Sequence, residues 1–188
     1  WERVVVSRVQ TEKNRPVVVG RSLVEIANGW GLDPVDAYLR LLAEEDTAVS
    51  FVGHGMSPEN VERVLRHPLV MIGSDGSSMA PVGEAAKARP HPRSYGTFPR
   101  VLGFYARERG LFGLPAAVHK MTALPADQIG LADRGRIARG KTADLVVFDA
   151  ARVRDTATFD DPHRYPEGIV HVLVNGVPVV ERGAHTGA

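Results

Sequence analysis

The feature that most constrains this chain is the apolar run "LVMI" at residues 69–72, which stops at Gly73 and is soon followed by Asp75. Helical patterns flank the run, over residues 57–68 before it and over residues 99–109 after it. A continuous apolar strand between helices is typical of a parallel sheet that is covered on both faces. In such sheets the ligand-binding groups lie at the carboxyl ends of the strands, which is the position that Asp75 occupies.

Short strands and capped helices alternate in the preceding part of the chain. Val-rich segments predict strands over residues 3–9 and 16–19, and a third strand is expected over residues 47–55. Three side chains are each placed to cap the first turn of a helix: Ser22, Asp33 and Ser57. On the helix after Asp33, four apolar side chains share the predicted buried face: Val35, Tyr38, Leu39 and Leu42.

A long loop follows Asp75 and leads into a different pattern. Residues 76–98 are rich in Gly, Pro, Ser and Ala, and helices are expected over residues 99–109 and 114–122. Beyond residue 135 the apolar segments are short and Val-rich, as strands are, and Asn175-Gly176 is a strong signal for a hairpin turn. The sequence therefore predicts an α/β part followed by a small β unit.

Charge and composition exclude several functions. The 23 basic and 22 acidic residues give a net charge of +1, which provides no long-range field for nucleic acid or an anionic membrane. No apolar run approaches the roughly 20 residues that cross a bilayer. The chain has no cysteine, so disulfides and thiolate metal ligands are excluded within it. The start, "WERVVVSRVQ", has neither an initiator Met nor a signal-peptide layout, which predicts a piece of a longer, cytoplasmic protein.

Local motifs leave Asp75 as the main candidate for chemistry. None of the seven histidines is spaced from another as H-x-H or H-x-x-x-H, so no strand or helix presents a chelating pair. The stretch "GSDGS" has Asp where a nucleophile elbow needs Ser. Asp75 has two interpretations. It caps the segment after the strand, or its carboxylate ligates a divalent metal at the mouth of a sheet and takes a proton from bound water.

Residues 69–103, with "LVMIGSDG" and "HPRSYGTFPRVLG", resemble the last barrel strand and following loop of the N-acyl-D-amino-acid deacylases. These enzymes are the D-aminoacylase branch of the amidohydrolase superfamily. The likeness continues through "KMTALPADQIGLADRGRIARGKTADLVVFDAARV" and covers nearly the whole chain. The module from Thr122 to Asp149 recurs widely in amidohydrolases and indicates the superfamily, whereas "HPRSYGTFPRVLG" is narrower and carries the subfamily assignment.

The resemblance implies an α/β fold: the C-terminal part of a (β/α)8 TIM-like barrel plus strands of a small β-sandwich domain. Residues 1–48 are then expected to be an insert or extension of the barrel domain. Residues 49–135 would hold the last barrel strand, the active-site loop and helices. Residues 136–188 would form the C-terminal part of the β-sandwich.

The family hydrolyses the amide of N-acyl-D-amino acids to a carboxylate and a free D-amino acid, using zinc. By resemblance, Asp75 is the metal-binding acid at the end of the eighth barrel strand, which binds the attacking water and passes its proton to the leaving amine. Zinc lowers the pKa of bound water towards roughly 7 and polarises the scissile carbonyl. One carboxylate can accept the proton and return it, because the amine must be protonated to leave.

Other site residues follow from the same resemblance. The family's H-x-H pair, ligating Cys and two later His have no counterpart here, so most zinc ligands are expected upstream of Trp1 and the piece alone is expected to be inactive. Arg93 is expected to pair with the α-carboxylate of the small-molecule substrate, and His91 to line its pocket. An equal alternative is that Arg93 orders the loop by bonding backbone carbonyls. Tyr95 and Phe98 are expected to anchor the loop in the core.

Two other functions stay open. One is a different amidohydrolase, such as a dihydropyrimidinase-like hydrolase of cyclic amides, although "HPRSYGTFPRVLG" argues against it. The other is a metal-free barrel domain kept for binding or assembly, which the missing ligands favour if 188 residues are the whole protein. Zinc content, together with cleavage of D- but not L-substrates, separates these possibilities.

Overall fold

In the computed structural model, which describes residues 1–187, the chain divides into two units that are not continuous in sequence. Unit 1 comprises Trp1–Met56, Gly76–Ser94 and Ala157–Arg164. Unit 2 comprises Ser57–Asp75, Tyr95–Thr156 and the residues from Tyr165 onward. The domain boundaries expected after residues 48 and 135 remain predictions. None of the helices within residues 1–187 has the length and apolar character that a membrane span requires.

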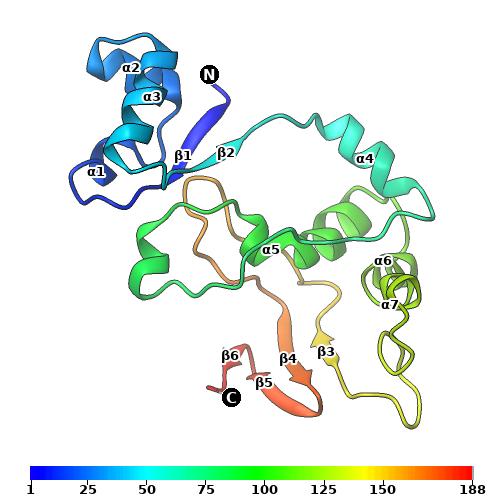
Figure 1. Ribbon diagram of the computed structural model, residues 1–188. Helices are drawn as coiled ribbons and strands as arrows, with labels where there is room; N and C mark the ends of the chain where they lie inside the picture. The colour runs from blue at the N-terminus through cyan, green and yellow to red at the C-terminus, as the bar shows by residue number, and fades with distance from the viewer. Residues whose placement is uncertain (188) are drawn as a thin grey trace. The chain divides into compact units, whose positions relative to one another are not determined.

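Unit 1 is built on two antiparallel strands, β1 (Val4–Arg8) and β2 (Ser50–Gly53), as predicted for this part of the chain. Three helices connect the strands and lie beside them (Figure 1): α1 (Arg15–Val18), α2 (Leu23–Trp30) and α3 (Pro34–Glu44). The core between these elements is aliphatic and buried: Val6, Val9, Val18, Leu23, Ile26 and Leu41. A short 3-10 helix, η1 (Gly83–Lys87), also belongs to unit 1.

The predicted helix starts are confirmed where a side chain caps the first turn. Ser22 accepts a hydrogen bond from the N–H of Glu25, and the Glu25 carboxylate accepts one from the N–H of Ser22 (2.7 Å), so a capping box begins α2. Asp33 begins α3 by accepting a hydrogen bond from the N–H of Val35 (2.8 Å). Local hydrogen bonds of this kind need no information from the rest of the fold, which is why the sequence reveals them.

The strand predicted over residues 16–19 is wrong, because most of this segment is the helix α1. Pro16 has the backbone angle that a first helical turn requires and has no N–H to leave unpaired there. The N–H of Val18 then donates to the carbonyl of Asn14 (3.0 Å). The preference of valine for strands is therefore overridden by the proline that precedes the run.

The predicted buried face of α3 is also wrong in part. Val35 and Leu39 are 44% and 55% exposed, whereas Ala37 and Leu41 are fully buried. Tyr38, also on the predicted face, packs against the core as expected. Apolar residues lie on both sides of this helix, so their spacing alone does not distinguish the buried side from the exposed one.

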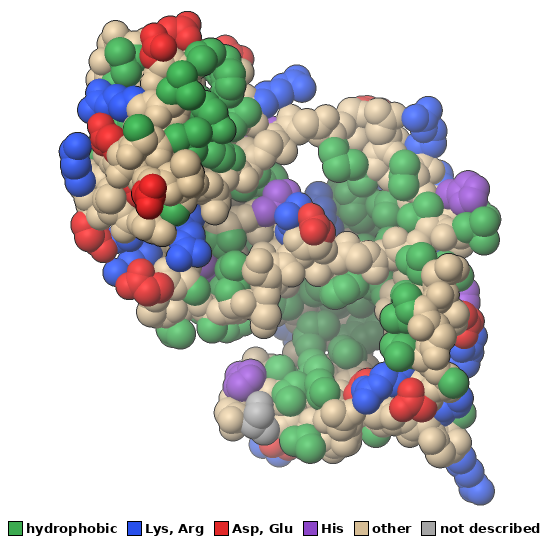
Figure 2. Space-filling view, viewed as in Figure 1, with side chains coloured by type: hydrophobic (Ala, Val, Ile, Leu, Met, Phe, Trp, Pro, Cys, Tyr) green, Lys and Arg blue, Asp and Glu red, His purple; other side chains and the backbone are tan. Residues whose placement is uncertain are grey.

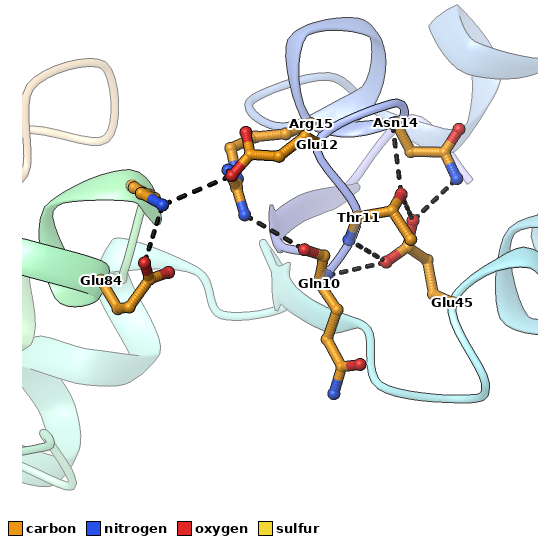
Figure 3. A network of polar contacts seen from close by, with 8 residues as sticks. Gln10, Thr11, Glu12, Asn14, Arg15, Glu45 and Glu84 are labelled. Atoms are coloured by element: carbon orange, nitrogen blue, oxygen red, sulfur yellow. Dashed lines mark hydrogen bonds and ion pairs between the residues drawn. The ribbon is translucent and has the colours of Figure 1, made fainter.

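A buried carboxylate ties the loop after β1 to the end of α3. Glu45 is 1% exposed and accepts four hydrogen bonds (Figure 3): from the N–H groups of Gln10 (2.7 Å) and Thr11 (2.9 Å), from the Thr11 hydroxyl, and from the Asn14 amide (2.7 Å). Burial raises the pKa of Glu45, but the hydrogen bonds, led by those of Thr11, outweigh burial and hold the pKa below its ordinary value. The fold of unit 1 therefore stabilises Glu45 in its charged form.

The first part of unit 2 is helical. Its helices are α4 (Pro58–Arg66), α5 (Arg93–Arg100), the π-helix η2 (Val101–Glu108), α6 (Leu114–Met121) and α7 (Ala123–Ile129), of which α5 begins with the last residues of a unit 1 segment. As predicted, Ser57 caps α4 by accepting a hydrogen bond from the N–H of Asn60 (3.2 Å). The helices share an apolar core: Ile72, Val101, Leu102, Ala117 and Val153.

The helix expected over residues 99–109 begins earlier, at Arg93, and contains Pro99. Proline cannot donate the backbone hydrogen bond of an α-helix, and its ring crowds the preceding turn. The chain continues past Pro99 as the wider π-helix η2, which accommodates that interruption. The helix predicted over residues 114–122 is confirmed by α6.

The second part of unit 2 is an antiparallel sheet in the order β3 (Leu145–Phe148), β4 (Ile169–Val174), β5 (Val177–Glu181) and β6 (Ala184–His185). The predicted hairpin turn is confirmed, with Asn175 and Gly176 both at positive φ (52° and 81°). Apolar side chains lie on the surface of the region that Figure 1 draws as these strands (Figure 2), and four valines there are exposed: Val146, Val147, Val174 and Val177.

The strand predicted over residues 69–72 forms no ladder, and every ladder within residues 1–187 is antiparallel, so the expected parallel sheet is not among them. The reason lies in the hydrogen bonds of the segment. The N–H of Val70 donates to the carbonyl of His67 (3.1 Å), and the N–H of Ile72 donates to the carbonyl of Lys120 (3.0 Å). The run is thus held by the end of α6 instead of by a neighbouring strand.

Candidate active site

Asp75 lies where the apolar run ends, three residues after the buried Ile72. Its backbone has φ of 47°, in the left-handed region that is costly for most side chains and that Asp and Asn tolerate best. A residue held in this conformation requires support from its surroundings, and such residues cluster at functional sites. Asn175, in a hairpin turn, has a similar φ of 52°, so the backbone of Asp75 is compatible with both interpretations and its catalytic role stays a prediction.

Lys120 provides the support for the segment that leads to Asp75. Its side chain is buried, and its ammonium group donates hydrogen bonds to the carbonyl oxygens of His67 and Val70 (3.0 Å for Val70). Its own carbonyl accepts the N–H of Ile72. Burial lowers the pKa of the Lys120 ammonium group. One lysine of α6 thus satisfies the backbone that an isolated strand would leave unpaired.

The long loop after Asp75 closes on itself. A Cβ placed on Gly76 would lie 2.9 Å from the Cα of Ser94 and 3.2 Å from the carbonyl oxygen of Arg93, so the two ends of the loop touch through their backbones. Glycine is required at this close approach. The residue that follows Asp75 is therefore fixed against the first turn of α5.

The two predicted substrate residues of the loop, His91 and Arg93, are joined by a hydrogen bond. The imidazole Nδ1 of His91 accepts the N–H of Arg93 (3.0 Å), and the carbonyl of His91 accepts the N–H of Ser94 (3.2 Å). These bonds pair the N–H groups of the first two residues of α5, which have no partner within a helix. The "HPR" stretch therefore has a structural role through His91, and the substrate roles of both residues remain predictions.

The expected loop anchors differ from each other. Tyr95 is buried and packs its ring against Tyr165 (5.7 Å between centroids), and burial raises the pKa of its hydroxyl, so its role as an anchor is confirmed. Phe98 is 43% exposed and is not a core anchor. The buried side of α5 is formed by Tyr95, Gly96 and Pro99, which leaves Phe98 outside it.

Three residues that support this region are missed by sequence reasoning: Lys120, Phe159 and His163. Phe159 packs against the rings of His54 and His91, and His163 bonds the carbonyl of Ala88 in the loop. The histidines are visible in the sequence, but their partners lie far away along the chain. The weak local signal is that Lys120 shares a buried helix face with Ala117.

A zinc site requires more ligands than these residues bring together. Among residues 1–187, no group of three or more His, Cys, Asp or Glu side chains is arranged to hold a metal ion. Asp75 can offer one carboxylate, and a catalytic zinc site takes about three protein ligands. The described residues by themselves do not fit a zinc ion.

Comparison with known proteins gives the family. Residues 21–180 match the amidohydrolase family. The chain is 48% identical over 172 residues to an N-acyl-D-glutamate deacylase and to a D-aminoacylase, both from Alcaligenes xylosoxydans xylosoxydans, and each match covers 92% of this chain and 33% of the relative. A crystal structure of D-aminoacylase matches with a TM-score of 0.84 and 42% identity, over 99% of this chain and 36% of that one.

N-acyl-D-glutamate deacylase from Bordetella bronchiseptica, in a complex with zinc and a phosphonate inhibitor, matches with a TM-score of 0.82 and 38% identity, over 98% of this chain and 36% of that one. The chain belongs to the amidohydrolase family, and its similarity to D-aminoacylases confirms the resemblance carried by "HPRSYGTFPRVLG". The α/β fold class is confirmed as well, as part of an amidohydrolase fold. The chain spans about a third of the length of the relatives it matches.

Proposed function

We propose that this chain acts, within a protein of the relatives' length, in the zinc-dependent hydrolysis of N-acyl-D-amino acids to a carboxylate and a free D-amino acid. Its relatives are an N-acyl-D-glutamate deacylase, a D-aminoacylase and an N-acyl-D-aspartate deacylase. The observation that carries the proposal is the 48% identity of the chain to the first two of these relatives over 172 residues. A cytoplasmic location stays a prediction.

Asp75 is the proposed acid–base residue and one zinc ligand. Bound zinc would polarise the scissile carbonyl of the substrate and lower the pKa of the attacking water. The carboxylate of Asp75 accepts a proton from the attacking water and later donates it to the amide nitrogen, because an amine leaves only in its protonated form. The remaining ligands would come from the two thirds of the relatives' length that this chain does not match.

Arg93 and His91 are the proposed substrate residues. A guanidinium group can pair with the α-carboxylate of an N-acyl amino acid through two parallel hydrogen bonds. The hydrogen bond between the Arg93 N–H and the His91 imidazole holds the backbone of Arg93 in place. His91 would line the pocket from the same turn.

The test is to express the complete reading frame, measure its zinc content, and measure cleavage of N-acetyl-D-methionine and its L-form. Asp75→Asn is the informative variant, because Asn tolerates the left-handed backbone and removes only the charge. We expect the wild type to contain zinc and cleave only the D-form, and we expect Asp75→Asn to fold but lose turnover about a thousandfold.

Asp36→Asn is the matched control, since Asp36 is exposed on α3, and it should keep full turnover. Full activity of Asp75→Asn would reduce Asp75 to a turn residue and end the proposed mechanism. A complete protein that binds no zinc would favour a binding or assembly role instead.

A further inference from the structure

The short segment Ala157–Arg164 packs within unit 1, although the chain on both sides of it belongs to unit 2. It is a tight turn: the N–H of Thr158 donates to the carbonyl of Asp161 (3.0 Å), and the N–H of Asp161 donates to the Thr158 hydroxyl (2.9 Å). Phe159 lies in this turn and is 47% exposed.

Two imidazole rings contact the side chain of Phe159. The ring of Phe159 lies 4.5 Å from that of His54 and 4.9 Å from that of His91, with interplanar angles of 65° and 79°. These edge-to-face arrangements are the favourable geometry for aromatic rings. His54 is itself fixed, because its N–H donates to the carbonyl of Arg3 (2.8 Å) just after β2. Phe159 therefore lies between a fixed strand end and the loop that carries His91.

A second contact of the same segment holds the same loop. The Nε2 of His163 lies 2.7 Å from the carbonyl oxygen of Ala88, and because a carbonyl only accepts, His163 is the donor. The next residue of the loop, Arg89, donates its N–H to the carbonyl of Ser7 in β1 (2.7 Å). The loop is thus attached at neighbouring residues to β1 and to the Ala157–Arg164 turn.

The position of the His91 ring affects the backbone of Arg93 through a hydrogen bond. The Nδ1 of His91 accepts the N–H of Arg93, so rotation of the imidazole would release the first N–H of α5. Phe159 limits that rotation by packing against the ring. The contacts run from the turn to the imidazole and from the imidazole to the backbone of the arginine.

We propose that Phe159 is a positioning residue, which holds the ring of His91 and through it the arginine that binds the substrate carboxylate. The role rests on the proposed function, because it assumes that Arg93 contacts substrate. Phe159 touches neither the substrate nor the reacting atoms in this proposal. Its effect is therefore expected in substrate binding and not in the chemical step.

The test uses the complete, zinc-loaded protein and three variants: Phe159→Leu, Phe159→Tyr and Phe98→Leu. Leu fills similar space without a ring, Tyr restores the ring, and Phe98 is a comparably exposed phenylalanine outside the turn. We expect Phe159→Leu to raise KM for N-acetyl-D-methionine about fivefold with little change in kcat. Phe159→Tyr and Phe98→Leu should stay near the wild type. Trypsin should cleave Phe159→Leu faster after Lys87, which lies in the loop and is followed by Ala88.

Trypsin cleavage needs no enzymatic activity, so it separates the two proposals. A wild type without deacylase activity ends the proposed function, while faster cleavage in Phe159→Leu alone still supports the contact. Unchanged cleavage in Phe159→Leu overturns the positioning role. Faster cleavage of Phe159→Leu with an unchanged KM also overturns the positioning role. The same holds if Phe159→Tyr behaves like Phe159→Leu.

Discussion

The ammonium group of Lys120 donates a hydrogen bond to the carbonyl oxygen of Val70 (3.0 Å), and the carbonyl of Lys120 accepts the N–H of Ile72 (3.0 Å). These bonds fix the segment that ends at Asp75. A buried lysine is costly unless its donors are satisfied, and here the satisfied donors replace the ladder of a regular strand. The lysine thus links the stability of unit 2 to the placement of the proposed acid–base residue.

Replacing Lys120 by Met keeps the volume of the side chain and removes its donors. The carbonyls of His67 and Val70 would lose a partner in a buried place, so the free energy of unfolding should fall by about 2–3 kcal/mol. Turnover should fall as well, because Asp75 loses its support. Urea unfolding and kcat of the complete protein measure both effects. Lys141→Met is the control, since Lys141 also donates to a carbonyl, that of Ala132, but is exposed. Equal effects of the two substitutions would contradict the role of burial.

Gly76→Ala tests the closure of the loop. Its Cβ would meet the backbone of Ser94 at 2.9 Å, so one end of the loop must move away from the other. We expect kcat/KM for the D-substrate to fall about tenfold or more, because small displacements of catalytic groups are costly. Gly73→Ala is the matched control, as nothing lies within 4 Å of its Cβ, and it should have near wild-type activity. Similar losses in both variants would argue against a specific contact at Gly76.

The elements that the sequence predicts are those with local causes. The caps at Ser22, Asp33 and Ser57 and the Asn175-Gly176 turn depend on residues within a few positions of each other, and all are confirmed. The segment over residues 16–19 is wrong as a strand because Pro16 favours the start of a helix over the strand preference of valine. The segment over residues 69–72 is wrong because a hydrogen-bond partner elsewhere decides its structure. For the second segment that partner is Lys120, which lies far along the chain and could not be identified from the apolar run.

The candidate site divides in the same way. Asp75 is found from the pattern and the family resemblance, and its left-handed backbone is a feature that the pattern does not contain. Tyr95 is predicted correctly as an anchor, but Phe98 is not. Both side chains are aromatic, so the sequence does not distinguish them, and only their packing in the structure does. Phe159 and His163 are found only when the structure brings their turn beside the loop that contains His91.

Gly103→Ala is expected to destabilise unit 2. A Cβ at Gly103 would lie 2.5 Å from the carbonyl oxygen of Val153, which also accepts a hydrogen bond from Arg107 (2.7 Å). Overpacking there should lower the free energy of unfolding by about 1–3 kcal/mol. Gly29→Ala provides the contrast, because its Cβ meets nothing within 4 Å and it lies in α2, so it should stabilise by up to about 1 kcal/mol. A stabilising Gly103→Ala in urea unfolding would refute the close contact.

Acid should weaken unit 1 through two neighbouring carboxylates. The hydrogen bonds to Glu45 overcome its burial and lower its pKa from an ordinary value of 4.5, and the hydrogen bond from Arg40, with one from Asn14, lowers the pKa of Glu44 to about 2. The folded protein therefore binds fewer protons than the unfolded one at these groups. Their contribution to stability is complete above pH 4.5 and is lost as the pH falls through the folded pKa values, towards about 2 for Glu44.

Glu45→Gln tests this contribution (Figure 3). The amide would place an N–H₂ group against the donors of Thr11 or Asn14, so the free energy of unfolding at pH 7 should fall by about 2 kcal/mol. The difference from the wild type should shrink as the pH falls below 4.5, because the unfolded wild type then takes up a proton that the folded carboxylate, with its lower pKa, does not yet bind. Both tryptophans of the chain, Trp1 and Trp30, lie in unit 1, so their fluorescence during urea unfolding reports on it. Glu2→Gln is the control, because Glu2 is exposed. If Glu45→Gln lowers the free energy of unfolding by the same amount from pH 7 to pH 3, the charge of Glu45 is not the cause of the loss.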